Sequence, residues 1–168
     1  MMQSQPLSQK KSKIGAVICV IGRQGSGKTP VTKRLADNSG FKNIAVYDPR
    51  REYDANKYTL FYTLTNFKKF LKRAKNTFII VEEATGFIGG YKDLETWTDE
   101  IIGIQHKNNI LVFIFHSLSD APAYILRLSR FVVLLKTNDE AEVIKQSRPK
   151  FFKFMNKEGD QYIDVNNL

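Results

Sequence analysis

The sequence predicts one α/β domain in which helices flank a mostly parallel central β-sheet. Short apolar runs alternate along the chain with stretches of helical periodicity, and the runs are almost continuously apolar. Continuous apolar character is typical of parallel strands that are buried on both faces. The length of 168 residues suits a single core. We therefore expect a disordered basic arm over residues 1–12 and one domain over residues 13–168.

Five apolar runs are the predicted strands of this sheet. They cover residues 14–21, 43–47, 77–81, 110–115 and 131–135. Strands that alternate with helices imply parallel pairing, because each connection must cross a face of the sheet. At the C-terminal end, residues 151–165 are expected to form a β-hairpin that turns at residues 157–160.

Helices are predicted between the strands. They cover residues 27–38, 66–75, 94–106, 121–128 and 139–146. In the first helix, Pro30 falls in the opening turn, where a missing N–H is tolerated, and Gly40 ends the helix. Asn66 is the expected N-cap of the second helix. The segment from residue 49 to about residue 64 fits neither pattern.

Charge and cysteine content narrow the class of protein. The formal net charge is +9 and the pI is about 9.6, which favours polyanionic partners such as nucleic acid or an anionic membrane surface. The single cysteine, Cys19, lies inside an apolar run, as expected for a buried residue in a reducing compartment. The longest apolar runs are too short to cross a bilayer. We expect a soluble intracellular protein without a transmembrane segment.

A phosphate-binding motif follows the first predicted strand. Residues Gly22-Arg23-Gln24-Gly25-Ser26-Gly27-Lys28-Thr29 match the pattern G-x-x-x-x-G-K-S/T in full. In such a loop, the backbone N–H groups surround phosphate oxygens at the N-terminus of a helix. Lys28 is expected to reach the β- and γ-phosphates of ATP, and the Thr29 hydroxyl to bind Mg²⁺. The motif therefore predicts a Mg-ATP site.

Two carboxylates end the third predicted strand. Glu82 and Glu83 follow the run Phe-Ile-Ile-Val directly. In P-loop enzymes, a carboxylate at this place holds Mg²⁺ and the next one polarises the attacking water. We assign Glu82 to the metal and Glu83 to the general base. Two solvated carboxylates at a strand end are the alternative.

Polar residues also follow the fourth predicted strand, where His116 stands first. A polar side chain at the end of a central strand can sense the γ-phosphate or orient the water, and His116 is the candidate for this role. The alternative is a histidine that forms only local hydrogen bonds.

Taken together, these motifs resemble the HerA–FtsK superfamily of DNA-pumping P-loop ATPases, especially its small viral genome-packaging members. The likeness spans residues 14–135. It rests on four segments: residues 22–29, the run Tyr-Asp-Pro-Arg-Arg-Glu-Tyr at residues 47–53, the pair Glu82-Glu83, and the run His-Ser-Leu-Ser-Asp-Ala-Pro at residues 116–122. The second run is similar to the family's Asp-Pro-x-x-Glu-Tyr segment. The last is similar to its Gln-Arg-Pro-Ser-x-x-Pro segment, with His116 in place of glutamine.

The resemblance implies an ATPase that works as a ring of six subunits around double-stranded DNA. It further implies capsid vertex proteins as partners and a location in the host cytoplasm or the virion. In the family, a neighbouring subunit completes each ATP site with a basic residue. An arginine that is common just before the fourth strand is replaced here by His106 and Lys107, so Arg127 or Arg130 is the candidate for that role.

Two basic clusters have a functional and a structural interpretation. The helix at 66–75 carries Lys68, Lys69, Lys72, Arg73 and Lys75 opposite its apolar face. They either contact phosphates or form a solvated helix face. The C-terminal cluster interleaves Arg148, Lys150, Lys153 and Lys157 with Phe151, Phe152 and Phe154. These phenylalanines either stack on bases or belong to the core.

The leading functional hypothesis is an ATP-driven translocase that packages a viral genome into a preformed capsid. The alternatives are a membrane-associated motor for phage assembly or DNA export, a P-loop kinase for a small substrate, and a nucleotide switch that does not hydrolyse ATP. The base Glu83 argues against a pure switch, and the glycine-rich region after it lacks the arginines of a kinase lid.

Overall fold

A sheet of seven strands forms the centre of the described chain, which comprises residues 15–88, 91–155 and 157–168 of the computed structural model. The strands are β1 (Ala16–Ile21), β2 (Asn43–Tyr47), β3 (Thr59–Phe61), β4 (Thr77–Val81), β5 (Ile110–Phe115), β6 (Phe131–Leu134) and β7 (Gln161–Asp164). They lie in the order β3-β2-β4-β5-β1-β6-β7. Only the β6–β7 pair is antiparallel. The predicted α/β fold is confirmed, while the expected arm at residues 1–12 lies outside the described residues.

Six helices and two short 3-10 turns connect these strands in the described chain. They are α1 (Lys28–Asp37), α2 (Leu64–Leu71), η1 (Ala84–Gly86), α3 (Tyr91–Lys107), α4 (Ala123–Leu128), α5 (Ala141–Ser147), α6 (Pro149–Met155) and η2 (Val165–Asn167). No helix within these residues is both long and apolar enough to cross a membrane.

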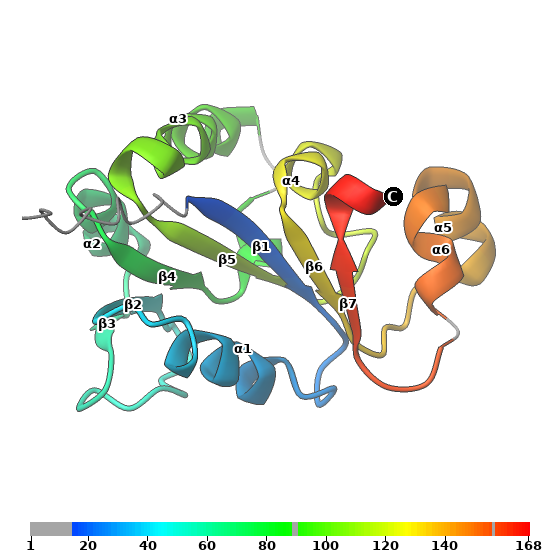
Figure 1. Ribbon diagram of the computed structural model, residues 1–168, viewed down its shortest axis with the longest axis horizontal. Coiled ribbons are helices and arrows are strands. Elements are labelled where there is room, and N and C mark those ends of the chain that lie inside the picture. The colour runs from blue at the N-terminus through cyan, green and yellow to red at the C-terminus, as the bar shows by residue number, and fades with distance from the viewer. Residues whose placement is uncertain (1–14, 89–90, 156) are drawn as a thin grey trace, which may run out of the picture.

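Helices cover the two faces of the sheet unequally. Figure 1 shows α1 on one face, whereas α2, α3 and α4 lie on the other and the α5–α6 pair lies beyond β7. The core accordingly has two layers. One contains Val31 of α1 with Tyr53 and Tyr58, and the other contains Phe67 of α2 and Trp97 of α3. Every residue of β4 and β5 is buried, which explains why their sequences are apolar apart from Thr77.

An aromatic cluster fills the layer under α2 and α3. The ring of Trp97, the single tryptophan, is fully buried. Its centroid lies 5.2 Å from that of Phe113 on β5, 6.1 Å from Phe87 after η1 and 6.4 Å from Phe67 on α2. The cluster therefore joins the sheet, a helix and the segment that follows Glu83.

The N-cap predicted for α2 is wrong by one helical turn. Thr63, not Asn66, precedes the helix with extended backbone angles, and its hydroxyl accepts a hydrogen bond from the Asn66 N–H. Threonine is itself a favourable N-cap, and starting the helix at Leu64 lets that residue pack against the core.

The antiparallel pair at the C-terminal end is present, but its first strand differs from the prediction. Gln161–Asp164 pairs with β6, so Val132 lies opposite Ile163. Residues 149–155, by contrast, form the helix α6. Pro149 occupies the first position of this helix, where its fixed φ is favourable.

Candidate active site

The carboxyl ends of β1, β2, β4 and β5 meet at one edge of the sheet, and the predicted site residues follow these ends. Parallel strands place their carboxyl ends together, so segments distant in sequence come into contact there. Lys28 and Thr29 follow β1 and open α1. Glu82 and Glu83 follow β4, and His116 follows β5.

The glycine-rich loop, residues 22–29, is fixed to the end of β5 and to the segment that follows β6. The Gly22 N–H donates to the Phe115 carbonyl at 3.1 Å, and the Arg23 N–H donates to the Lys136 carbonyl at 2.8 Å. A Cβ atom at Gly22 would collide with the Ser26 side chain and lie 2.9 Å from Leu135 Cβ. Glycine is therefore required at this position, where the backbone passes close to its neighbours.

Two further glycines allow the loop to turn into α1. Gly25 and Gly27 have φ angles of 73° and 95°, in the left-handed region that L side chains rarely adopt. Gln24 and Gly25 are exposed at the tip of the loop. The strand, loop and helix thus follow one another as the motif predicts, and α1 presents its N-terminus to the loop.

Lys28 lies within the loop rather than in solvent. Its Nζ donates to the Arg23 carbonyl at 2.9 Å. Burial lowers the pKa of Lys28, while the nearby carboxylates of Glu82 and Glu83 act in the opposite direction. The ammonium group is therefore partly desolvated and close to both predicted acidic residues.

Glu82 is a buried carboxylate, with a residue exposure of only 6%. The Tyr53 hydroxyl donates to Glu82 Oε1 at 2.6 Å. Burial is the main cause that raises the pKa of Glu82 to about 7, and the hydrogen bond from Tyr53 opposes this effect. The carboxylates of Glu52, Glu83 and Asp48 raise it further. A cation bound here would offset the repulsion between these carboxylates and favour the ionised form of Glu82.

Glu83 is held by cationic or polar groups on both carboxylate oxygens. Oε1 lies 2.9 Å from Arg50 Nε, and Oε2 lies 3.1 Å from His116 Nε2. The Glu83 backbone has φ 55° and ψ 34°, an uncommon conformation for a residue other than glycine. The His116 backbone is also fixed, because its backbone N–H donates to Thr85 Oγ1 at 3.2 Å. The contact between Glu83 and His116 brings together two predicted catalytic residues.

The turn after β2, residues 48–53, forms a wall of the site that the sequence did not reveal. Asp48 is fully buried, and its carboxylate accepts hydrogen bonds from the N–H groups of Glu52 and Tyr53. The turn thereby directs Arg50 toward Glu83 and Tyr53 toward Glu82. The only sequence signal was the run at 47–53 within the family resemblance, which assigned these side chains no role.

The oxygen atoms near Thr29 suit a hard cation. Thr29 Oγ1 lies 3.5 Å from Glu52 Oε2, and Glu82 stands at the end of the strand beside β2. Within the described residues, no group of three or more acidic, histidine or cysteine side chains could hold a metal by itself. Mg²⁺ takes one or two carboxylates together with waters and phosphate oxygens, so a hydroxyl and a few carboxylates fit it.

An open hollow of about 560 Å³ adjoins the loop and His116. Its lining includes Arg23, Gln24, Ser117 and the acidic side chains of Asp139 and Glu140. The hollow gives solvent, or a group from another molecule, access to the side of the site that carries His116.

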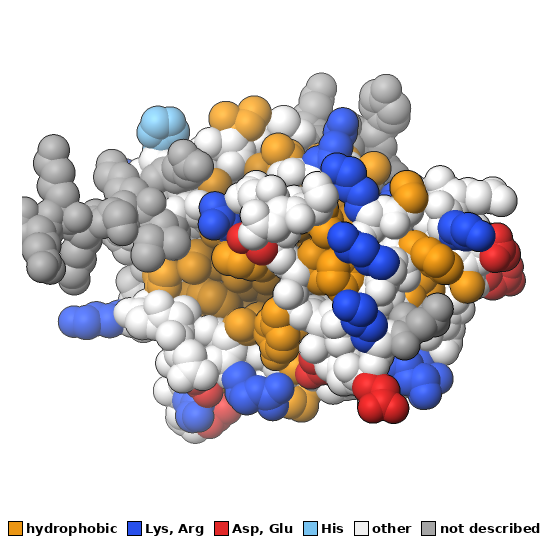
Figure 2. Space-filling model, turned by 45° about the vertical axis from the view of Figure 1, so that its right-hand side comes forward, with side chains coloured by type: hydrophobic (Ala, Val, Ile, Leu, Met, Phe, Trp, Pro, Cys, Tyr) orange, Lys and Arg blue, Asp and Glu red, His pale blue; other side chains and the backbone are white. Residues whose placement is uncertain are grey.

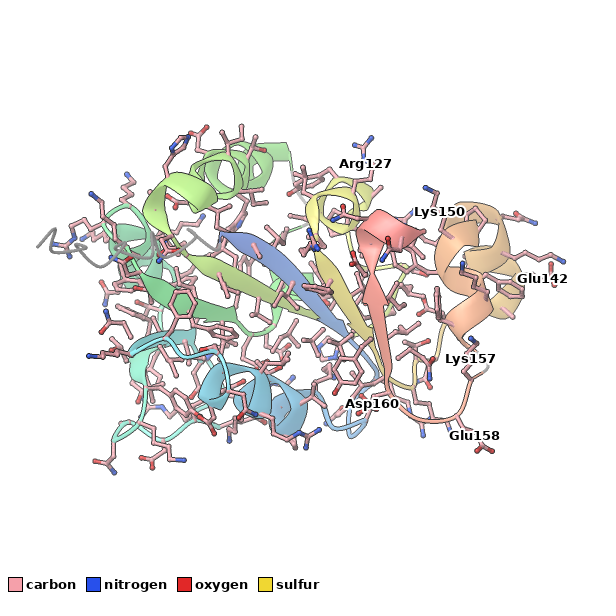
Figure 3. All side chains as sticks on the ribbon, in the orientation of Figure 1. Arg127, Glu142, Lys150, Lys157, Glu158 and Asp160 are labelled. Atoms are coloured by element: carbon pink, nitrogen blue, oxygen red, sulfur yellow. The ribbon has the colours of Figure 1, made fainter. Side chains whose placement is uncertain are left out.

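The two arginines predicted to act across a subunit boundary lie away from this edge. Arg130 precedes β6, where its guanidinium is 3.8 Å from Asp164 and lies over the Phe131 ring. Arg127 is exposed on α4, at the opposite end of the molecule from Asp160, which lies beside the loop (Figure 3). Neither completes the site of its own chain.

Comparisons with known proteins agree on the fold. No protein-family model matches the chain, and no curated protein matches its sequence. Among solved structures, the chain is similar to the genome packaging NTPase B204 of Sulfolobus turreted icosahedral virus 2 in complex with AMPPCP. The TM-score is 0.72 at 14% identity, over 91% of this chain and 94% of that one.

Two other structures extend the comparison. The DNA-packaging ATPase B204 from Sulfolobus turreted icosahedral virus gives a TM-score of 0.66 at 14% identity, over 90% of this chain and 93% of that one. The RadB recombinase gives 0.53 at 16% identity, over 76% of this chain and 77% of that one. At such identities the likeness concerns the fold, which is the α/β fold of P-loop NTPases.

Proposed function

We propose that this protein is an ATP-hydrolysing DNA translocase that packages a viral genome into a preformed capsid. The observation that carries the ATPase part is the convergence of Lys28, Glu83 and His116 at the carboxyl edge of the sheet. A phosphate-binding loop alone serves many purposes. A carboxylate beside it that is oriented by a histidine supplies a base for the attack of water.

Each residue of the site has a role in this proposal. The loop N–H groups, from Gly22 to Thr29, surround the phosphates, and Lys28 neutralises charge on the β- and γ-phosphates. Glu83 accepts a proton from the attacking water. The water oxygen bonds to the γ-phosphorus, and the bond between that phosphorus and the bridging oxygen breaks, so that ADP leaves. His116 keeps the Glu83 carboxylate in place through Oε2.

Thr29 and Glu82 are the residues that would hold Mg²⁺, Glu82 acting through bound water. The ion supplies positive charge that stabilises the phosphate oxygens during transfer. Glu82 suits this task because its carboxylate is already fixed by Tyr53 and lies in a strongly negative environment.

DNA is proposed as the substrate because the protein is basic and its lysine and arginine side chains cluster on one part of the surface. Figure 2 shows a row of lysine and arginine side chains on the face that lies beyond β6 in Figure 1. A groove of about 460 Å³ on the C-terminal part of the chain is lined by Arg127, Arg148 and Lys150 together with apolar side chains such as Leu126 and Phe151. Such a surface fits a phosphate backbone without reading its sequence.

The oligomeric state and location follow from the same proposal. The hollow beside His116 is open to a neighbouring subunit, which would add a basic residue to the site, with Arg127 as the candidate exposed on its surface. We propose a ring, of six subunits, in the host cytoplasm and at the capsid vertex. The names of the two B204 proteins, a genome packaging NTPase and a DNA-packaging ATPase, support the packaging role.

The test is ATP hydrolysis by the purified protein, with and without double-stranded DNA, at low salt. We expect DNA to stimulate turnover, and Glu83→Gln to reduce it by about 10²–10⁴-fold, the usual contribution of a general base. Glu142→Gln is the matched control, since Glu142 lies exposed on the outer side of α5 (Figure 3).

Turnover that ignores DNA would contradict the translocase and leave an ATPase with another task. Turnover by Glu83→Gln equal to that of Glu142→Gln would remove Glu83 as the base. Phosphorylation of an added nucleoside or nucleotide would instead support the kinase alternative.

A further inference from the structure

Arg50 lies in the candidate site, but none of the sequence motifs gives it a role. It stands at the centre of the turn after β2, and its Nε lies 2.9 Å from Glu83 Oε1. About half of the Arg50 side chain is exposed, so the contact is not forced by burial. Its position is set by the turn, because the Arg51 N–H donates to the Asp48 carbonyl at 3.3 Å and the Asp48 carboxylate holds the next two N–H groups.

The guanidinium of Arg50 keeps most of its hydrogen-bonding capacity free. Arginine has five N–H donors in a planar fork. Nε is the Arg50 atom that lies against Glu83, as an ion pair, and among the described residues Arg50 has no other hydrogen-bond or ion-pair partner. The four donors on the two Nη atoms therefore remain available to an acceptor that enters the site.

Arg50 is also close to the phosphate-binding lysine. Its positive charge is one of the causes that lower the pKa of Lys28. Lys28 and Arg50 are thus near enough for their charges to interact, and the Glu83 carboxylate lies near both of them. Two cations that repel each other across a space are stabilised when a polyanion enters it. A planar guanidinium suits phosphate oxygens in particular.

We propose that Arg50 binds the terminal phosphate of the nucleotide from within the same subunit and holds Glu83 beside it. Nε orients the carboxylate, and the Nη groups contact γ-phosphate oxygens. The inference rests on the proposed function, which it deepens by naming the residue that distinguishes ATP from ADP. It also assigns a phosphate cation to the chain itself, in addition to any residue from a neighbour.

Binding of AMPPCP and of ADP, each with Mg²⁺, tests the proposal without requiring hydrolysis. By calorimetry, we expect Arg50→Ala to weaken AMPPCP about tenfold or more, the size of a charge-assisted hydrogen bond. Its affinity for ADP should change by less than about twofold, because that nucleotide lacks the contacted group. Arg50→Lys should restore part of the affinity for AMPPCP.

Arg51→Ala is the matched control, since it removes the same charge from the same turn. Arg51 lies over the Tyr62 ring, 4.5 Å from its centroid, instead of facing Glu83. The affinities of Arg51→Ala for AMPPCP and ADP should equal those of the wild type. Thermal unfolding of each variant shows whether a loss of binding comes from a loss of folding.

Three outcomes would overturn the proposal. Equal effects of Arg50→Ala and Arg51→Ala would indicate general charge, and equal losses for AMPPCP and ADP would indicate a structural role. An Arg50→Lys variant that binds AMPPCP as tightly as the wild type would show that the guanidinium has no particular role. Failure of the wild type to bind either nucleotide would contradict the proposed function itself.

Discussion

The environment of Glu82 opposes ionisation in the nucleotide-free protein. Its carboxylate is buried, and three other carboxylates lie near enough to raise its pKa further. The folded-state pKa of about 7 exceeds the ordinary value of 4.5. The native state therefore binds more protons than the unfolded state between these two values, and stability falls as the pH rises through this window. Above pH 7, the full unfavourable contribution is present.

We predict that Glu82→Gln stabilises the nucleotide-free protein above pH 7 by up to about 2–3 kcal/mol, with little effect near pH 4.5. The amide oxygen still accepts the Tyr53 hydrogen bond but carries no charge. Urea denaturation between pH 4.5 and pH 8, compared with the wild type, measures the difference. A difference that does not grow with pH would show that Glu82 is not the titrating group.

At this scale, the sequence predicted the residues that a motif specifies and missed those that only the fold brings in. Lys28 and Glu83 were predicted because loop and strand-end patterns carry chemical meaning. Arg50 and Tyr53 were not, because their roles depend on β2 lying beside β4. His116 was proposed as a site residue because it follows a buried strand, and in the structure its ring contacts Glu83.

Among the elements, η1 connects the candidate site to the aromatic cluster. Glu83 precedes η1 directly, and Phe87 follows it and packs against Trp97. A change in the Glu83 backbone, which adopts an uncommon conformation, would therefore reach the tryptophan within a few residues.

We predict that Mg-AMPPCP changes the fluorescence of Trp97, because repositioning of Glu83 shifts Phe87 against the indole. The change should be smaller in Phe87→Leu, which keeps an apolar side chain and removes the ring contact. Since Trp97 is the single tryptophan, steady-state emission during a titration is sufficient. An identical change in both proteins would place the movement elsewhere.

The elements differed in how well periodicity predicted them. β4 and β5 were found because every residue in them except Thr77 is apolar, and all of them are buried. β3 was missed because three residues carry no period. The C-terminal prediction took the aromatic run of α6 for a strand, although Phe151 and Phe154 are three residues apart, as on one face of a helix, and Pro149 marks its start.

On the scale of the whole molecule, the accessibility of the Cys19 thiol shows whether the sheet is folded. It lies on β1, between β5 and β6, and is fully buried. Burial raises the pKa of its thiol to about 12, and its Sγ lies 3.1 Å from Ser129 Oγ. No thiolate is exposed in the native state, so a reagent reaches it only when the sheet opens.

We predict that iodoacetamide labels Cys19 only through unfolding. Mg-AMPPCP at 100 times its dissociation constant should slow labelling about 100-fold, because it stabilises the native state by mass action. Mass spectrometry of aliquots, with a fully denatured sample as the reference, measures the rate. Rapid labelling without denaturant would show that β1 opens locally.

The strand order is the property that one sequence predicts least. Alternating strands and helices predicted a parallel sheet, but many orders satisfy that pattern. Each neighbour of β1 is fixed by packing between residues more than 90 positions apart, such as Cys19 with Phe113. No local signal specifies such pairs.

The hydrogen bonds that fix the glycine-rich loop to the end of β5 and to the segment after β6 have a mechanical consequence. Gly22 and Arg23 cannot shift without breaking these bonds or moving Phe115 and Lys136. If the protein moves DNA as proposed, the movement must arise in parts of the site other than this anchored loop. The segment from Glu83 to Phe87 is one such part, because Glu83 contacts His116 at the end of β5 and Phe87 packs against the Trp97 indole.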